Sequence, residues 1–168
     1  MKKISNLLIV GLGNIGSRYL KIIKLIRPEI SIYTLRRSIS EETFFNHLIE
    51  RNFVEIEDAI NYGIDAAIIS SPSTLHVMQA LKFVENNIPI LIEKPLSYKL
   101  DNCFELNDIA TKKNSLILIG YVLRHTEVLK KFHEIIKNKN QDSFSLIEIT
   151  TISINVSITF NFVCLNFI

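Results

Sequence analysis

The sequence predicts an α/β fold, a doubly wound parallel sheet followed near the carboxyl end by one further strand. Two patterns lead to this fold class. Apolar runs of strand length alternate with segments whose apolar residues recur at helical spacing through most of the 168 residues. Such alternation is typical of a parallel sheet with helices on both faces. Several apolar runs also turn polar at their carboxyl ends, where ligands bind in open parallel sheets.

The composition fits one domain with part of another, and it excludes several classes of partner. A chain of this length buries one good core. The net charge is only +2, and basic residues are spread among acids, so we expect neither nucleic acid nor a membrane as a partner. Cys103 and Cys164 lie far apart, outside any metal-binding or C-x-x-C motif. We therefore expect reduced thiols, a cytoplasmic location and no metal site.

The first apolar run, residues 7–10, leads into the motif G-L-G-N-I-G over residues 11–16. Gly11 permits a tight turn, Gly13 has no side chain to keep a pyrophosphate away, and Gly16 lets the following helix pack closely. The free N–H groups of the first helical turn favour a diphosphate. The motif therefore predicts the cofactor-binding turn of a Rossmann dinucleotide-binding fold. Its contacts to the cofactor are expected from Gly11, Gly13, Asn14, Ile15 and Gly16.

The elements up to residue 63 follow in order. Residues 18–26 place apolar residues at helical spacing beside a basic stripe, and Pro28 ends this helix. Residues 30–35 are β-branched and aromatic, which favours a strand. Residues 40–51 begin with two acids and continue with apolar residues at helical intervals, so a second helix is expected. Shorter elements are a strand at 53–54 and a helix over 57–62 that Gly63 ends.

The end of the second strand bears on the choice of cofactor. Arg36, Arg37 and Ser38 lie about 20 residues past the glycines, where an acidic residue would bind the ribose of NAD. Guanidinium groups can instead bind a 2′-phosphate in a bidentate way, and Ser38 can add a hydrogen bond. We therefore predict NADP as the cofactor. NAD is the alternative, in which both arginines are only solvated loop charges.

A buried strand is expected over residues 65–69, and its carboxyl end turns polar at once. The residues there are Ser70, Ser71, Pro72 and Ser73. Ser73 can cap a helix that runs through His76 to residue 87. Taken alone, His76 is more often a core or helix-surface residue than a ligand-binding group. Its place after Ser71-Pro72-Ser73 leaves both a structural role and a role at the cofactor open.

The next strand, residues 88–92, delivers Glu93, Lys94 and Pro95. A Glu–Lys pair at the end of an apolar strand is costly unless both groups are used or paired. One interpretation is an ordinary salt bridge to each other or to a neighbour, and the other is a functional role for Lys94. The remaining predicted elements are helices over residues 101–113 and 127–137 and a strand over residues 116–119, after which come Gly120, Tyr121 and Arg124.

Four of these places together resemble the Gfo/Idh/MocA oxidoreductases. That family is named for glucose-fructose oxidoreductase, inositol dehydrogenase and a rhizopine-catabolism protein. The resemblance runs from about residue 7 to residue 149, and the Glu-Lys-Pro sequence is its most specific piece. The four places are the glycine motif, Ser71-Pro72-Ser73 with His76, Glu93-Lys94-Pro95, and Gly120-Tyr121 with Arg124.

The resemblance implies an enzyme that transfers a hydride between NAD(P) and a carbon of a sugar, cyclitol or related polyol. It assigns residues 1–124 to the dinucleotide-binding domain and residues 125–168 to the remnant of a substrate domain. Lys94 would match the lysine that reaches the nicotinamide ribose and the substrate oxygen, where an ammonium stabilises an alkoxide and shuttles its proton. Cofactor contacts are further implied for Ser70, Ser71, Pro72, Ser73, His76, Glu93, Pro95 and Arg124.

The last stretch departs from the family. Family members continue into a second α/β domain that supplies an aspartate and a histidine for the acid/base step. Residues 146–162 instead alternate apolar and polar residues with period two, which indicates a β-strand and not a membrane helix. We expect one long strand without partners, able to pair with another copy of the chain. The resemblance implies that it is only the first strand of the second α/β domain.

Three explanations for this ending stay open. The chain is a truncated product of a longer gene, it is completed by a separate polypeptide, or it is a free-standing nucleotide binder. We expect truncation, with cofactor binding but little or no turnover by this chain alone. The alternative function is that of a non-catalytic regulatory protein that binds the nucleotide and joins a partner by adding its last strand to the partner's sheet.

Overall fold

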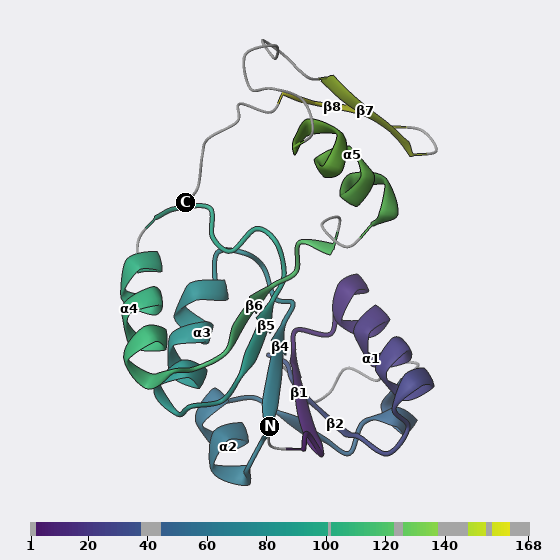
Figure 1. Ribbon diagram of the computed structural model, residues 1–168. Helices are drawn as coiled ribbons and strands as arrows, with labels where there is room; N and C mark the ends of the chain where they lie inside the picture. The colour runs from purple at the N-terminus through teal and green to yellow at the C-terminus, as the bar shows by residue number, and fades with distance from the viewer. Residues whose placement is uncertain are drawn as a thin grey trace. The chain divides into compact units, whose positions relative to one another are not determined.

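The computed structural model of the protein describes residues 3–37, 45–100, 102–122, 126–137, 148–153 and 156–161. The chain divides into two compact units, residues 1–121 and 122–168. The first unit is built on a six-stranded sheet in the order β3-β2-β1-β4-β5-β6, and all neighbouring strands run parallel. Figure 1 shows this sheet with helices on both sides. The predicted α/β doubly wound parallel sheet is confirmed.

The strands of the first unit are short, apolar and mostly buried, as expected where helices cover both faces of a sheet. Their bounds are β1 Asn6–Val10, β2 Ser31–Leu35, β3 Arg51–Phe53, β4 Ala66–Ile69, β5 Ile90–Ile92 and β6 Ile117–Ile119. β1 pairs with both β2 and β4, so the strand order changes direction between β1 and β4. In sheets of this type ligands bind in the crevice outside the carboxyl ends of the strands at this point.

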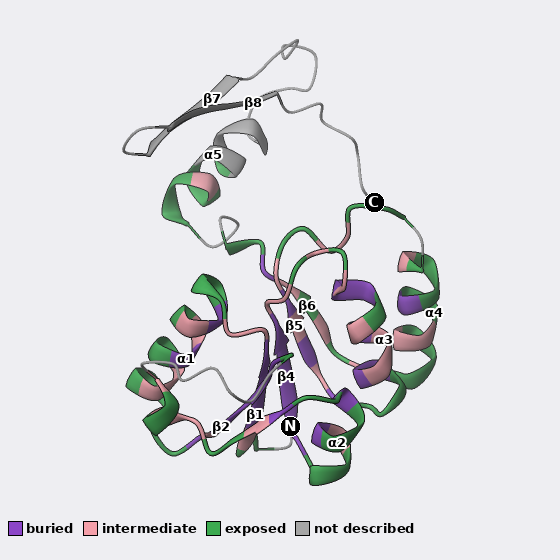
Figure 2. Ribbon diagram, turned by 180° about the vertical axis from the view of Figure 1, so that it is seen from behind, coloured by how far each residue is buried: buried purple, intermediate pink, exposed green. Residues whose placement is uncertain are grey.

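Within the described residues, one helix covers one face of the sheet, and three helices cover the other. Leu20 of α1 is fully buried in the cluster that includes Ile32 of β2, whereas Phe83 of α3 is fully buried in the cluster that includes Ile92 of β5. Figure 2 shows the buried residues concentrated in the strands and on the inner sides of these helices. The helices are α1 Asn14–Ile26, α2 Ile56–Tyr62, α3 His76–Glu85 and α4 Cys103–Lys113.

Proline and glycine end the helices where the sequence predicts it. Helix α1 ends at Ile26, two residues before Pro28. Helix α2 is followed by Gly63 with φ of +96°, a left-handed conformation that closes the last turn and that glycine adopts without a steric penalty.

The helix expected over residues 40–51 is wrong in its described part. Residues 38–44 lie outside the described residues, and from residue 45 the chain forms only the single 3-10 turn η1, Asn46–Leu48, before β3 begins at Arg51. Phe45, Leu48 and Ile49 pack against the core on the α1 side of the sheet. The spacing of these apolar residues therefore reflects contact with the core from a loop, since apolar periodicity in so short a segment does not require a helix.

The capping role predicted for Ser73 is also wrong. Helix α3 begins at His76, its N-cap position is Leu75, and no side chain caps it. The residues before it form a turn in which the Leu75 N–H donates to the carbonyl of Pro72 at 2.9 Å. This turn moves the helix start past the position that the Ser73 side chain could cap.

The described part of the second unit contains one helix and two strands. Helix α5, Glu127–Lys137, has the predicted bounds. The tail, for which the sequence predicts a single unpaired strand, instead contains β7, Glu148–Ser153, and β8, Val156–Asn161, which pair antiparallel. Pairing gives partners to backbone groups that a lone strand would leave open. The sequence did not show the reversal because neither glycine nor proline lies between the two strands. In the described part of the chain, every helix is too short or too polar to span a bilayer.

Candidate functional site

The motifs identified in the sequence come directly after four neighbouring strands of the sheet. Gly11 follows β1, Ser70 follows β4, Glu93 follows β5 and Gly120 follows β6. Because these strands are parallel, all four residues emerge at the same edge of the sheet. Backbone bonds continue the ladder there: the N–H of Ser70 donates to Val10, that of Glu93 to Ile69 and that of Gly120 to Ile92, at 2.9, 2.9 and 2.7 Å. Residues from four separate parts of the sequence therefore meet at this carboxyl edge.

The glycine turn has the conformation that the sequence predicts. Gly11 has φ of +84°, and an added Cβ would lie 2.9 Å from the Cα of Ser71. At Gly16, an added Cβ would lie 2.1 Å from the carbonyl oxygen of Gly11. Both positions therefore exclude any larger residue, the first through backbone conformation and packing and the second through packing alone.

Gly13 differs from the other two glycines because its Cα faces open space. An added Cβ would meet no atom of the described protein within 4 Å. Gly13 is also the N-cap residue of α1, no side chain caps this helix, and its first turn has no acidic residue. The N–H groups of that turn are thus open to an anion at the positive end of the helix dipole. This arrangement can bind a phosphate or diphosphate through its charge and its hydrogen-bond donors.

Two serines after β4 connect the glycine turn to the neighbouring loop. The Ser70 hydroxyl lies 2.8 Å from the carbonyl oxygen of Gly11 and 3.1 Å from that of Val10. The Ser71 hydroxyl donates to the Gln79 side chain of α3 at 2.5 Å. Both hydroxyls therefore bond to the protein itself and fix the position of residues 70–73 beside the turn. Pro72 and Ser73 complete this loop.

His76 is almost completely buried, with 1% of its surface exposed. Its Nε2 lies 2.8 Å from the carbonyl oxygen of Ser71, and its Nδ1 lies 3.0 Å from that of Pro95. The imidazole ring thus bridges the loop after β4 and the loop after β5. This position matches the structural role that the sequence left open, in which His76 fixes two loops at the carboxyl edge.

Glu93 and Lys94 do not pair with each other through their side chains. One carboxylate oxygen of Glu93 accepts a hydrogen bond from the Tyr19 hydroxyl of α1 at 2.6 Å, and the other accepts the N–H of Lys94 at 3.1 Å. Partial burial, followed by the hydrogen bond to Glu93 and its charge, raises the pKa of Tyr19 well above its usual value. The phenol therefore stays protonated at neutral pH and acts as the donor.

Lys94 is exposed, and its ammonium makes no hydrogen bond or ion pair with any residue in the described part of the chain. The salt bridge considered for it is therefore absent there. The peptide bond to Pro95 is cis. Lys94 thus presents an ammonium to solvent at the carboxyl edge of the sheet, one residue after Glu93 and the end of β5.

Arg36 lies at the carboxyl end of β2 and is only 9% exposed. Its Nε donates to the Oδ1 atom of Asn52 on β3 at 3.2 Å, and the Thr34 hydroxyl donates to the same oxygen. Arg36 is therefore an ordered, buried cation and not a solvated loop charge, whereas Arg37 is exposed. Ser38 and Arg124 lie outside the described residues.

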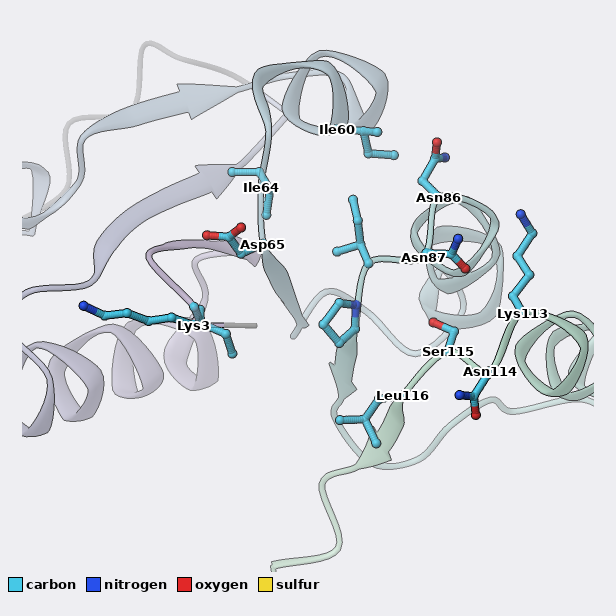
Figure 3. A pocket seen from close by; sticks show the side chains of 13 residues that line it. Lys3, Ile60, Ile64, Asp65, Asn86, Asn87, Lys113, Asn114, Ser115 and Leu116 are labelled. Atoms are coloured by element: carbon cyan, nitrogen blue, oxygen red, sulfur yellow. The ribbon is translucent and has the colours of Figure 1, made fainter. Parts of the chain in front are cut away.

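A cavity of about 550 Å³ lies at the opposite edge of the sheet, beneath the amino ends of β4, β5 and β6 (Figure 3). Two of the charged groups that line this cavity bond to the backbone of the surrounding elements. The Lys113 ammonium donates to the carbonyl of Glu85 at the end of α3, and one Asp65 carboxylate oxygen accepts the N–H groups of Ser5 and Asn6. The cavity is at the other end of the strands from the glycine turn, so it is not the expected dinucleotide site. Among the described residues no group of histidine, cysteine, aspartate or glutamate is arranged to hold a metal ion.

Comparison with known protein families identifies the family to which this fold belongs. Residues 5–121 match the model of the Gfo/Idh/MocA family, which is described as an oxidoreductase family with an NAD-binding Rossmann fold. The chain belongs to this family. A related member is the uncharacterized oxidoreductase YrbE of Bacillus subtilis strain 168, which is 27% identical over 147 residues that make up 85% of this chain and 43% of YrbE.

Solved structures of dehydrogenases share the fold of this family member. Myo-inositol 2-dehydrogenase from Lactobacillus plantarum aligns with a TM-score of 0.71 at 20% identity, over 81% of this chain and 42% of its own. Scyllo-inositol dehydrogenase from Lactobacillus casei, with bound NAD(H) and scyllo-inositol, aligns with a TM-score of 0.70 at 20% identity, over 80% and 41%. The WlbA dehydrogenase from Chromobacterium violaceum, in complex with NADH and UDP-GlcNAcA, aligns with a TM-score of 0.72 at 16% identity, over 81% and 40%. This chain thus spans less than half the length of these relatives.

Sequence reasoning missed Tyr19 as a residue of the site. The helical pattern counted it among the apolar positions of α1, and its partner Glu93 lies 74 residues away. One indication was available, because a tyrosine on the buried side of a helix usually finds a hydrogen-bond partner for its hydroxyl.

Proposed function

We propose that this chain binds NADP at the carboxyl edge of its sheet and forms the nucleotide-binding part of an oxidoreductase that acts on a sugar or polyol. The observation that carries the proposal is the common position of the glycine turn and Lys94. The open backbone beside Gly13 and the Lys94 ammonium, which makes no hydrogen bond or ion pair within the described residues, lie at the same edge of the sheet, after β1 and β5. A dinucleotide that extends along this edge can contact both.

The diphosphate of the cofactor would be held by the backbone. Gly11 turns the chain, Gly13 leaves room at the start of α1, and the N–H groups of Asn14 and Ile15 face the anion at the positive end of the helix. The bonds from Ser70 to the carbonyls of the turn keep this backbone rigid, so little conformational entropy is lost on binding.

Arg36 supports NADP over NAD. It occupies the position past β2 at which an acidic residue binds the ribose of NAD, and Asn52 orients its guanidinium. A guanidinium bonds well to a phosphate, because its fork of N–H donors matches two phosphate oxygens. Arg37 and Ser38 would add to the same site.

Lys94 is the proposed catalytic residue. When bound, the nicotinamide ring accepts or supplies the hydride. In the reduction of a carbonyl, the Lys94 ammonium would stabilise the negative charge that hydride transfer places on the substrate oxygen and would give that oxygen a proton. In the oxidation of a hydroxyl, the neutral amine of Lys94 would accept the hydroxyl proton as the hydride leaves the carbon. The inositol and sugar-nucleotide dehydrogenases with this fold support a polyol or sugar as the substrate class.

Calorimetric titration of the 168-residue chain with NADPH and with NADH tests the proposal. We expect NADPH to bind with a micromolar dissociation constant and NADH to bind about tenfold more weakly, because one phosphate–guanidinium contact is lost. Absence of binding by both nucleotides would overturn the proposed function. Tighter binding of NADH would retain the site and reverse the choice of cofactor.

A further inference from the structure

We propose that Tyr19 is a positioning residue that holds the Glu93 carboxylate away from Lys94 and so keeps the Lys94 ammonium available to a ligand. The inference concerns a contact between the first helix and the end of the fifth strand. It rests on the proposed function only in that the ligand of Lys94 is taken to be the nicotinamide cofactor and its substrate.

Adjacent residues of opposite charge attract each other, so the separation of Glu93 and Lys94 needs a cause. Without other partners, two such side chains would approach each other at least part of the time. In this structure the Glu93 carboxylate is turned toward α1 and bonded by the Tyr19 hydroxyl at 2.6 Å. Its second oxygen is bonded to the Lys94 backbone N–H and not to the ammonium.

The backbone of Gly120 helps to confine the same carboxylate. An added Cβ at Gly120 would lie 3.2 Å from Oε1 of Glu93 and 3.4 Å from Oε2. The carboxylate therefore lies directly against the start of the loop after β6. A side chain at residue 120 would push it by a few tenths of an ångström. Tyr19, the Lys94 N–H and Gly120 thus fix the carboxylate from three elements of the fold.

A phenol suits this position because it donates a hydrogen bond to the Glu93 carboxylate and carries no charge of its own. A tyrosine is already protonated near neutral pH, and partial burial with the nearby carboxylate raises the pKa of Tyr19 further, so the donor persists in alkaline solution. A cation at position 19 would neutralise Glu93 instead, and an apolar residue would leave the carboxylate without its hydrogen bond. Tyrosine provides the bond and leaves the charge of Glu93 confined between α1 and β6.

The test measures the reactivity of Lys94 in the full chain without any cofactor. Each lysine is acetylated briefly at a series of pH values, and labelling is measured by mass spectrometry with the exposed Lys99 and Lys112 as internal references. In Tyr19→Phe we expect the freed carboxylate to pair with Lys94 and to lower its labelling at pH 8 about threefold, because an opposite charge favours the unreactive ammonium form. In Tyr19→Phe combined with Glu93→Gln, labelling should return to the native level.

Two further variants keep the result interpretable. Tyr62→Phe removes a tyrosine hydroxyl from α2, away from this loop, and should leave Lys94 labelling unchanged. Gly120→Ala displaces the carboxylate without altering Tyr19 and should change the labelling of Lys94 in the same experiment. Native labelling of Lys94 in Tyr19→Phe, or a decrease that Glu93→Gln does not reverse, would overturn the role of Tyr19. Because no nucleotide is present, this outcome is independent of the titration that tests the proposed function.

Discussion

The two edges of the six-stranded sheet carry similar residue types and use them differently. At the amino edge the ammonium of Lys24 donates to the Ile30 carbonyl at 2.7 Å, that of Lys113 donates to the Glu85 carbonyl at 2.8 Å, and Asp65 accepts two backbone N–H groups. At the carboxyl edge the loops are bonded to one another, yet the Lys94 ammonium and the space beside Gly13 remain open within the described residues.

The difference teaches how to distinguish a binding edge from a structural one. Polar residues and a cavity occur at the amino edge, but their hydrogen bonds close helix ends and connect strands. At the carboxyl edge the hydrogen bonds of Ser70, His76 and Tyr19 fix the loops. Within the described residues they leave the backbone of the turn and the Lys94 ammonium available. A ligand site needs groups that are available to bind the ligand, held in position by rigid surroundings.

The largest difference in effect is expected between substitutions at two glycines of the same turn, Gly16 and Gly13. Gly16→Ala forces a Cβ to within 2.1 Å of the Gly11 carbonyl oxygen, so we expect it to lower the free energy of unfolding by about 3 kcal/mol and to abolish nucleotide binding. Gly13→Ala adds a Cβ in open space. It should cost about 1 kcal/mol or less through the weaker helix cap, yet reduce NADPH affinity at least tenfold. Urea denaturation and calorimetry measure the two quantities, and equal stability losses in both variants would contradict the assignment of separate roles.

Lysines at the two edges give the next contrast. Lys94→Ala removes the open cation and should weaken NADPH binding about tenfold, the effect of losing one charge-assisted hydrogen bond, with little change in stability. Lys113→Ala should leave the affinity unchanged and cost no more than about 1 kcal/mol of stability, because its ammonium only caps α3. Unchanged affinity in Lys94→Ala would remove this residue from the site.

The arginines after β2 sharpen the account of cofactor choice. Arg36→Gln keeps a polar side chain near Asn52 but loses the cation, and we expect the ratio of NADPH to NADH affinity to fall severalfold, up to about tenfold. Arg37→Gln, which alters an exposed residue, should change the ratio less. Parallel titrations with both nucleotides measure it. An unchanged ratio in Arg36→Gln would favour NAD as the natural cofactor.

The smallest effect is expected for an ion pair on the helical surface. The Lys82 ammonium bonds to Glu57 and lowers the pKa of its carboxyl group, but both side chains are largely exposed to solvent. Lys82→Ala should lower Tm by no more than about 1 °C at pH 7. Because the pKa of Glu57 is depressed in the folded state, this small contribution is present above the ordinary glutamate pKa of 4.5 and is lost as the pH falls below it. If Lys82→Ala lowered Tm by more than this, and did so equally at pH 3, the loss of stability would not come from the ion pair between Lys82 and Glu57.

Local features of the fold could be predicted from the sequence, because each depends on neighbouring residues. The positive φ of Gly11 and the left-handed Gly63 result from the absence of a side chain, and the alternation of apolar runs with helical patterns indicated the parallel sheet. The meeting of four motifs at one edge was also predictable from this pattern. Parallel strands point the same way, so the loops at their carboxyl ends lie at a common edge of the sheet.

Features that depend on contacts between distant residues could not be predicted. Apolar spacing at Phe45, Leu48 and Ile49 indicated burial correctly but not a helix, because a loop packed on the core gives the same pattern. The bond between Tyr19 and Glu93 and the bridge through His76 connect loops and helices whose relative positions only the tertiary structure defines. The reversal between β7 and β8 lacked the glycine or proline that usually marks a hairpin.

One measurement tests most directly whether the glycine turn and Lys94 contact the same ligand. NADPH is titrated into the native chain while the amide resonances of Gly11 and Gly13 are followed by NMR and the acetylation of Lys94 is measured at each concentration. The account predicts that the glycine resonances shift and Lys94 becomes protected with the same midpoint. Shifted glycine amides with undiminished Lys94 labelling at saturating NADPH would contradict it.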